Sequence, residues 1–228
     1  MKAIHPDVFP IETLAANCYI VRSRDGLLMV DTGLNGSLKM IQNRAAAAGL
    51  DLAGLRLILI THADGDHYGG LTALKALSPK AVICASQPEA DAMARGQMSR
   101  PLKPKGLQGI FFRLVAPFVE SPPVKTDRVI QPGDSFAWLG GLVTLDSKGH
   151  TPGHLSFWSQ STGILFAGDS VLVHGKELLP AHGGNCWDEA LGKEAFERQL
   201  ALKPVAILGG HGIAPARNAR GVPRSASS

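Results

Sequence analysis

Apolar positions along the chain follow two periods, and each period predicts a different kind of element. Short apolar runs bounded by turn residues predict β-strands, and apolar residues spaced three or four apart predict helices. In the first half, strands are expected at 18–21, 27–30, 55–60 and 81–85, and helices at 38–48, 71–77 and 87–94. The Arg24-Asp25-Gly26 turn is typical of a β-hairpin, and Ser86 with Glu89 has the spacing of a helix-capping box.

The second half of the chain repeats this rhythm of strands followed by helix and strand. Strands are expected at 128–130, 136–139, 142–146, 155–158, 164–167 and 205–208, with a helix at 189–202. Two such halves favour an α/β fold with two sheets covered by helices.

The segment 99–123 between the halves has a different character, because five prolines are mixed with many apolar residues. A loop of this length and composition should pack against something. It could be a lid over a substrate site or a contact between copies of the chain. A self-packed connection without a role explains the composition equally well.

Composition is that of a globular protein: 45% of the 228 residues are hydrophobic and 18% are charged. We expect one domain at 1–215 and a flexible basic tail at 216–228. The net charge of +4 is mild, and elsewhere Lys and Arg are dispersed. A small-molecule substrate is therefore expected and a nucleic-acid partner is not. A homo-oligomer stays open.

The N-terminal stretch lacks the apolar core and cleavage site of a secretory signal, and no apolar run approaches the roughly 20 residues of a membrane span. The cysteines Cys18, Cys84 and Cys186 are odd in number and far apart, which does not favour a disulfide framework. Cys18 and Cys84 are interpreted as core residues. The expected location is cytoplasmic, without a membrane partner.

The strongest chemical signal directly follows the strand at 55–60. Four potential metal ligands fall within six residues: His62, Asp64, Asp66 and His67. Loops at strand ends are where a rigid scaffold presents convergent side chains. Imidazole suits zinc, copper or iron, and carboxylate suits harder ions.

Three further candidates, His150, Asp169 and His211, also follow predicted strands and lie beside glycines. Glycine lets the backbone turn sharply and approach an ion closely. Seven donors are too many for one tetrahedral ion, and they fit two ions.

With these motifs the chain resembles the metallo-β-lactamase superfamily, which includes glyoxalase II and lactonases. The resemblance runs from Val30-Asp31-Thr32-Gly33 to Gly210-His211-Gly212. It implies an αββα sandwich of two mixed β-sheets flanked by helices. It also implies the ligand roles: His62 and His150 on a first metal, Asp66, His67 and His211 on a second, Asp169 bridging, and Asp31 supporting the site.

One residue departs from the family pattern, because Asp64 stands where the family has the second His of His-x-His-x-Asp-His. Asp64 could bind the first metal through oxygen, which makes iron or manganese credible beside zinc. Alternatively Asp64 turns away, which leaves a weak first site or a single-metal enzyme.

The resulting hypothesis is a metal-dependent hydrolase with two zinc ions. A metal-bridging hydroxide would cleave a small ester, thioester or lactone, and Asp66 is the candidate catalytic proton acceptor. The alternatives are a phosphodiesterase or nuclease, and a non-haem iron redox enzyme of the same fold. His154 is expected to hydrogen-bond near the site or within the sheet. His174 and His182 follow Asp169 in a region that lines the substrate cleft in relatives, and the open interpretations are a substrate contact, proton donation, or simple surface placement.

Overall fold

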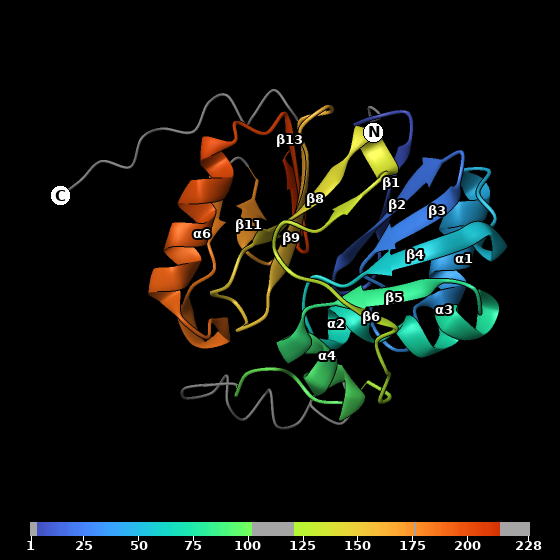
Figure 1. Cartoon of the computed structure of the whole chain (residues 1–228), viewed down its shortest axis with the longest axis horizontal. Coiled ribbons are helices and arrows are strands. Elements are labelled where there is room, and N and C mark those ends of the chain that lie inside the picture. Colours follow the sequence, from blue (N-terminus) through green and yellow to red (C-terminus); the bar gives the residue numbers. More distant parts are fainter. Residues whose placement is uncertain (1–3, 102–120, 176, 215–228) are drawn as a thin grey trace.

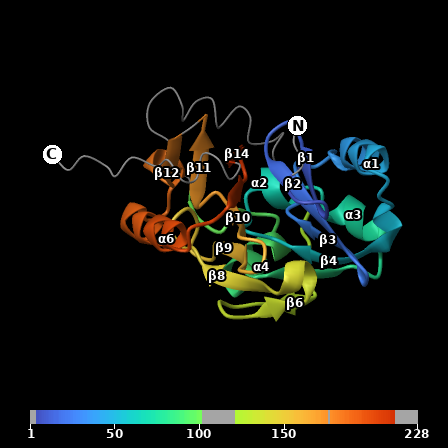
Figure 2. The same cartoon turned by 90° about the horizontal axis from the view of Figure 1, so that it is seen from above.

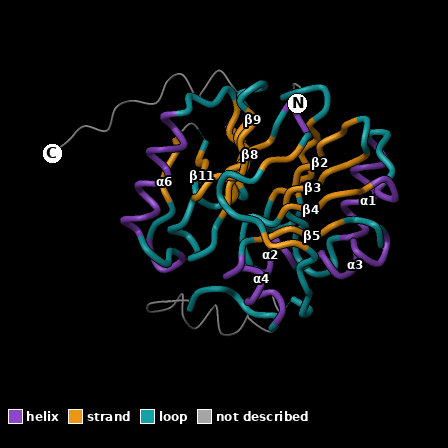
Figure 3. The backbone as a smooth tube through the Cα atoms, viewed as in Figure 1, coloured by secondary structure: helices purple, strands orange, loops and turns teal. Residues whose placement is uncertain are grey.

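Two β-sheets pack face to face in the computed structural model, which describes residues 4–101, 121–175 and 177–214. Figure 1 shows the sheets with helices on their outer flanks, and Figure 3 shows the same layers coloured by secondary structure. The layers follow the order helix, sheet, sheet, helix. The predicted α/β class and αββα sandwich are confirmed.

The first sheet comes from the N-terminal half and is mixed. Its strand order is β1 (Val8–Glu12), β2 (Asn17–Ser23), β3 (Gly26–Val30), β4 (Leu55–Leu59), β5 (Val82–Ala85) and β6 (Arg128–Val129). The helices of this half are α1 (Leu38–Ala47), α2 (Gly65–Tyr68), α3 (Leu71–Leu77) and α4 (Gln87–Ala94), with a 3-10 turn at Leu52–Gly54. Strands β3 to β6 run parallel, so the loops that follow them leave the sheet at one edge.

The second sheet has the order β7 (Ser135–Phe136), β8 (Leu142–Asp146), β9 (Leu155–Ser159), β10 (Ile164–Gly168), β13 (Ala206–Gly209) and β14 (Gly212–Ala214). Strands β10 and β13 are parallel neighbours, and the other pairs are antiparallel. Helix α6 (Glu189–Ala201) and the hairpin of β11 (Val171–His174) and β12 (Glu177–Pro180) complete this half; 3-10 turns lie at Trp138–Gly140 and Gly183–Asn185. Figure 2 shows α6 and the hairpin together, at the end opposite α1 and α3.

Alternating side chains explain how each sheet serves two cores. In β3, Leu28 points into the core between the sheets, and Met29 joins the core beneath the helices. In β10, Phe166 points into the core between the sheets, whereas Leu165 packs with Phe196 of α6. Burial on both faces holds the strands rigidly, so the loops at their ends are well positioned.

Most predicted elements are confirmed to within about two residues. The strand predicted at 136–139 is wrong beyond Phe136, because a 3-10 turn follows it. Leu139 has a left-handed backbone with φ 51°, and its carbonyl accepts hydrogen bonds from the hydroxyls of Ser159 and Ser161. That conformation cannot continue a strand.

Strand β1 was not predicted, because Pro10 interrupts its apolar pattern. β1 is the edge strand of the first sheet, where a missing N–H leaves no ladder bond unmade. The short helix α2, the β11–β12 hairpin and β14 were not predicted either.

Two other expectations concern parts of the chain that are only partly described. Most of the 99–123 segment (102–120) and the basic tail at 216–228 lie outside the described residues. Cys18, Cys84 and Cys186 are free and buried, which confirms the first two as core residues. Within the described ranges, the helices are too short or too polar to cross a membrane.

Candidate metal centre

The candidate ligands of the first sheet lie on the loop that follows β4 and on the short helix α2. His62 and His67 are fully buried, whereas Asp64 and Asp66 are partly exposed. Asp64 is the N-cap residue that precedes α2, and its carbonyl accepts the backbone N–H of His67 at 2.9 Å. The tight turn places all four side chains at one end of the sheet.

The candidate ligands of the second sheet come from three loops at its facing edge. His150 follows β8, Asp169 follows β10, and His211 lies in the turn between β13 and β14. A Cβ at Gly210 would collide with the carboxylate of Asp169 and the ring of His67, so only glycine allows this turn to approach them so closely.

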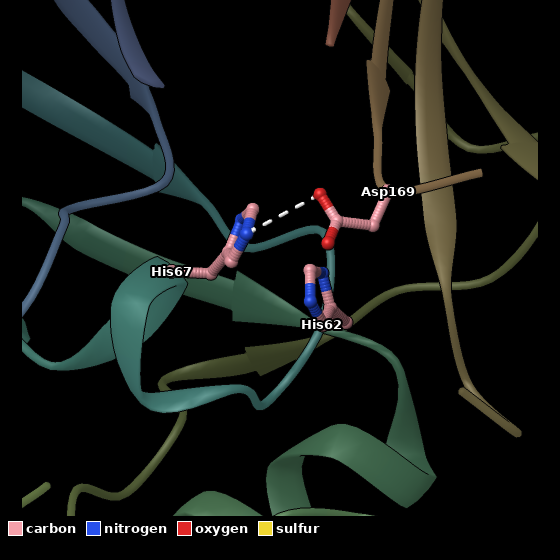
Figure 4. Close-up of side chains that lie close together, drawn as sticks. All are labelled: His62, His67 and Asp169. Atoms are coloured by element: carbon pink, nitrogen blue, oxygen red, sulfur yellow. Dashed lines mark ion pairs between the residues drawn. The ribbon is translucent and has the colours of Figure 1, made fainter. Parts of the chain in front are cut away.

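The structure brings all seven predicted ligands together in two groups that share one carboxylate. The first triad is His62, Asp64 and His150, and the second triad is Asp66, His67 and His211; the donor atoms of each triad lie within 4.8 Å of one another. Asp169 lies between the triads: its Oδ1 is 3.4 Å from Nε2 of His67, and its Oδ2 is 3.6 Å from Nε2 of His150 and 3.2 Å from Nε2 of His211. Figure 4 shows Asp169 facing His67 across the gap between the sheets, with His62 beside them.

Three of the histidines are fixed through the nitrogen that points away from the site. Nδ1 of His67 contacts the carboxylate of Asp31 at 2.9 Å, and Nδ1 of His62 contacts the hydroxyl of Thr61 at 2.9 Å. Nδ1 of His211 lies 3.0 Å from the carbonyl of Ala15. Partners of this kind orient metal-binding imidazoles, leaving Nε2 for the ion.

The chemistry of the remaining buried atoms fits metal ions. Four ligand atoms are buried without a hydrogen-bond partner: His62 Nε2, Asp64 Oδ1, His67 Nε2 and Asp169 Oδ1. Buried polar atoms are costly unless they are satisfied, and the four residues that carry these atoms belong to overlapping groups of potential metal ligands. A pair of divalent cations would satisfy these atoms, so the residues of this site fit a two-metal centre.

The two carboxylates at the centre are held in their charged form. Burial, the largest single influence, would raise the pKa of Asp169, but the nearby histidines His67, His211, His150 and His62 together hold this pKa well below its usual value. The same balance, with His150 and His62 opposing burial, keeps the pKa of Asp64 well below its usual value. Both groups therefore offer anionic oxygen across the neutral range.

The histidines of the second triad hold protons more firmly than usual. Burial, the largest single influence, would lower the pKa of His67, but the carboxylates of Asp169, Asp31 and Asp66 together raise this pKa well above its usual value. Asp169 also raises the pKa of His211. In contrast, burial lowers the pKa of His150 in the first triad. A metal ion entering the second triad must displace protons.

The sequence matches the family described as the Metallo-beta-lactamase superfamily over residues 11–211. The chain belongs to this superfamily. Among its relatives in Bacillus subtilis (strain 168), the uncharacterized protein YobT is 28% identical over 91% of this chain and 85% of its own length. The probable metallo-hydrolase YflN is 25% identical over 87% of this chain and 81% of its own length.

Two other superfamily members bear on activity and fold. A hydroxyacylglutathione hydrolase of Aeromonas hydrophila is 27% identical over 74% of this chain and 53% of its own length. A metallo-beta-lactamase family protein of Thermus thermophilus superimposes with a TM-score of 0.68 at 22% identity, covering 96% of this chain and 78% of that one. The Thermus thermophilus structure shows the fold alone. The superfamily match, YflN and the hydroxyacylglutathione hydrolase together indicate a metal-dependent hydrolase.

Glu89 is a buried residue near the site whose role sequence reasoning missed. The predicted capping box is wrong, because the Ser86 side chain makes no cap bond and Glu89 reaches across to two loops. Its Oε2 accepts the backbone N–H of Ala63 at 2.7 Å, and its Oε1 accepts the hydroxyl of Thr151 at 2.7 Å and the N–H of Gly153 at 2.9 Å. Glu89 thus ties together the loops that carry the first triad.

Arg100 was also missed: it falls in the segment 99–123, for which a lid over a substrate site was one of the open interpretations, but no pattern singled out this residue. Its Nη2 lies 2.6 Å from Oδ2 of Asp64 and 3.2 Å from Nε2 of His150. Its side chain is only 2% exposed. A buried cation therefore touches two members of the first triad.

His154 supports the bridging carboxylate from behind, as expected of a histidine near the site. Its Nε2 accepts the backbone N–H of Asp169 at 3.1 Å, so its Nδ1 carries the hydrogen that it donates to Ser147 Oγ at 2.7 Å. Burial lowers the pKa of His154 well below its usual value, which keeps this tautomer neutral. His174 and His182 are exposed on and beside the β11–β12 hairpin, without a contact to the seven ligands.

Proposed function

We propose that this protein hydrolyses a small ester, thioester or lactone with two divalent metal ions, zinc being the preferred pair and iron or manganese the alternatives. The observation that carries the proposal is the convergence of two ligand triads on the shared carboxylate of Asp169. Two ions held in this way suit the activation of water for attack on a carbonyl group. A relative named for hydrolysis of an acyl compound supports the same chemistry, although the chain spans only about half of it.

Each ligand has a role in this proposal. His62, Asp64 and His150 would hold one ion, Asp66, His67 and His211 the other, and Asp169 would contact both. Bound ions of this kind lower the pKa of a water molecule toward neutrality and polarise the scissile carbonyl oxygen.

Asp66 is the proposed proton acceptor during attack. Its carboxylate is partly exposed and lies 3.5 Å from Nε2 of His211, at the solvent side of the second triad. Asp169 and Asp64 are less exposed and lie among histidines, so their oxygens face the candidate metal ligands rather than solvent. Asp66 is thus the carboxylate best placed to take a proton and release it to water.

A substrate panel tests the proposal. The full chain, purified without added metal and analysed for bound elements, would be assayed with thioester, lactone, aryl ester, phosphodiester and β-lactam substrates. The largest kcat/KM is expected for an acyl substrate, and Asp66→Asn should lower kcat about a hundredfold or more. The exposed Asp91→Asn on α4 serves as control. A phosphodiester as the best substrate, or full activity in a metal-free protein, would overturn the proposal.

A further inference from the structure

The guanidinium of Arg100 lies among the donor atoms of the first triad. Oδ2 of Asp64 is 2.6 Å from Nη2 of Arg100 and 3.1 Å from Nε2 of His150, and the same Nη2 is 3.2 Å from that histidine nitrogen. One cationic N–H group is therefore directed at two atoms whose lone pairs a metal ion would use.

Geometry makes Arg100 and a metal ion competitors for these atoms. An ion would lie about 2.0–2.2 Å from the histidine nitrogen and from the carboxylate oxygen. Nη2 of Arg100 is already within hydrogen-bond range of both. Two positive charges that close repel strongly in a site shielded from water. Whichever oxygen of Asp64 an ion takes, an ion bound to Nε2 of His150 must displace Arg100 from that nitrogen.

Among the residues that the structure describes, the second triad has no Lys or Arg side chain at its donor atoms. In the described ranges, neither Lys nor Arg forms an ion pair with Asp66 or Asp169, whose contacts are to histidines. Behind His67 stands the carboxylate of Asp31, which favours a cation at Nε2 of that ring. The two triads therefore differ in the charge that surrounds them.

We propose that Arg100 is a built-in cation of the first triad, so that metal ions bind in sequence: tightly at the second triad with Asp169, and more weakly at the first, after Arg100 leaves Asp64. The inference rests on the metal centre of the proposed function, but it concerns binding order and does not depend on the substrate. Arg100 is a positioning and competing residue, and Asp64 is its counterion. Its Nε and Nη1 have no hydrogen-bond partner among the described residues, so Asp64 and His150 are the groups that hold the guanidinium, and moving it off Asp64 has a cost that weakens metal binding at the first triad.

Calorimetric titration of the metal-free full chain with Zn²⁺ tests this order. The wild type should bind two ions with dissociation constants that differ by about a hundredfold or more. Arg100→Met, which keeps the bulk and removes the charge, should tighten the weak step about tenfold or more and leave the tight step nearly unchanged. Arg100→Lys should resemble the wild type, and so should Arg95→Met, an exposed control nearby.

Two ligand variants show which triad is responsible for each zinc-binding step. His211→Ala should abolish the tight step, and His150→Ala the weak one. Two steps of equal affinity in the wild type, or a weak step that Arg100→Met leaves unchanged or weakens, would overturn the proposal. Should Arg100→Met fail to fold, Arg100→Gln and the wild-type titration decide the question. Sequential binding in a protein that hydrolyses none of the panel would sustain this inference and refute the proposed function alone.

Discussion

The two triads of the metal centre are supported in opposite ways. The second triad has a carboxylate behind its buried histidine, since Asp31 contacts Nδ1 of His67, and this raises the negative charge around the donor atoms. The first triad has a cation in front of its donors, since Arg100 contacts Asp64 and His150. Ligand identity alone would make the triads nearly equivalent. The difference predicts that neighbouring charges, more than the ligands themselves, set the relative metal affinities of the two triads.

The largest expected effect is that of Asp169→Ala, which should weaken metal binding at both triads at once. Because Asp169 contacts His67, His150 and His211, its loss should weaken both zinc-binding steps more than about a hundredfold, beyond what loss of an outer partner costs. Elemental analysis and calorimetry would measure this effect. Asp25→Ala, in the exposed hairpin turn, is the control. A variant that keeps two tightly bound ions would show that Asp169 does not join the triads.

Asp31→Asn should affect metal binding at the two triads unequally. It replaces the carboxylate behind His67 with a neutral amide, and the tight zinc-binding step should weaken about 10- to 100-fold. The weak step should weaken less, because Asp31 reaches His62 of the first triad only through Thr61. Calorimetric titration beside Asp51→Asn, an exposed helix-cap variant, would measure the difference. Equal weakening of both steps would mean that Asp31 supports the whole centre.

Acidity should affect the second triad more than the first. The pKa values of His67 and His211 are raised and that of His150 is lowered. Protons therefore compete with metal mainly at the second triad. Its zinc affinity should rise as pH rises, by about tenfold per unit for each proton released, and should level off above the raised pKa values.

Titrations in buffers of different ionisation enthalpy would count the released protons. More protons should be released in the tight step than in the weak one. The reverse order would contradict the assignment of the tight step to His67 and His211. Asp64 and Asp169, whose pKa values are well below the usual range, should contribute no dependence near neutral pH.

The smallest expected effect is that of Glu89→Gln on the first triad. The carboxylate of Glu89 accepts three hydrogen bonds, and an amide group would direct its own N–H at one of those donors. Loosening of the two loops should weaken the weak zinc-binding step by about tenfold or less and leave the tight step unchanged. Asp91→Asn, exposed on the same helix, is the control. A larger effect on the tight step would show that Glu89 serves another part of the site.

The sequence predicted the sheets and the ligands because both signals are local. Four candidate ligands stand within six residues, and each of the others follows, within four residues, a strand that its apolar pattern indicates. Arg100 and Glu89 act on partners 36 and 64 residues away, Asp64 and Gly153 respectively, so no local pattern marks them. Glu89 was even assigned to a local capping role that it does not have. Compensating charges around the ligands follow from tertiary packing, and there the sequence offered no signal.

Anomalous X-ray scattering at the zinc edge, from crystals of the full chain grown with zinc, tests the central claim most directly. The account predicts two peaks, each within about 2.0–2.3 Å of the donor atoms of one triad, with Asp169 contacting both. At limiting zinc, only the peak at Asp66, His67 and His211 should appear. An active protein without an anomalous peak beside Asp169, or with the side chains of the second triad turned away from one another, would contradict the account.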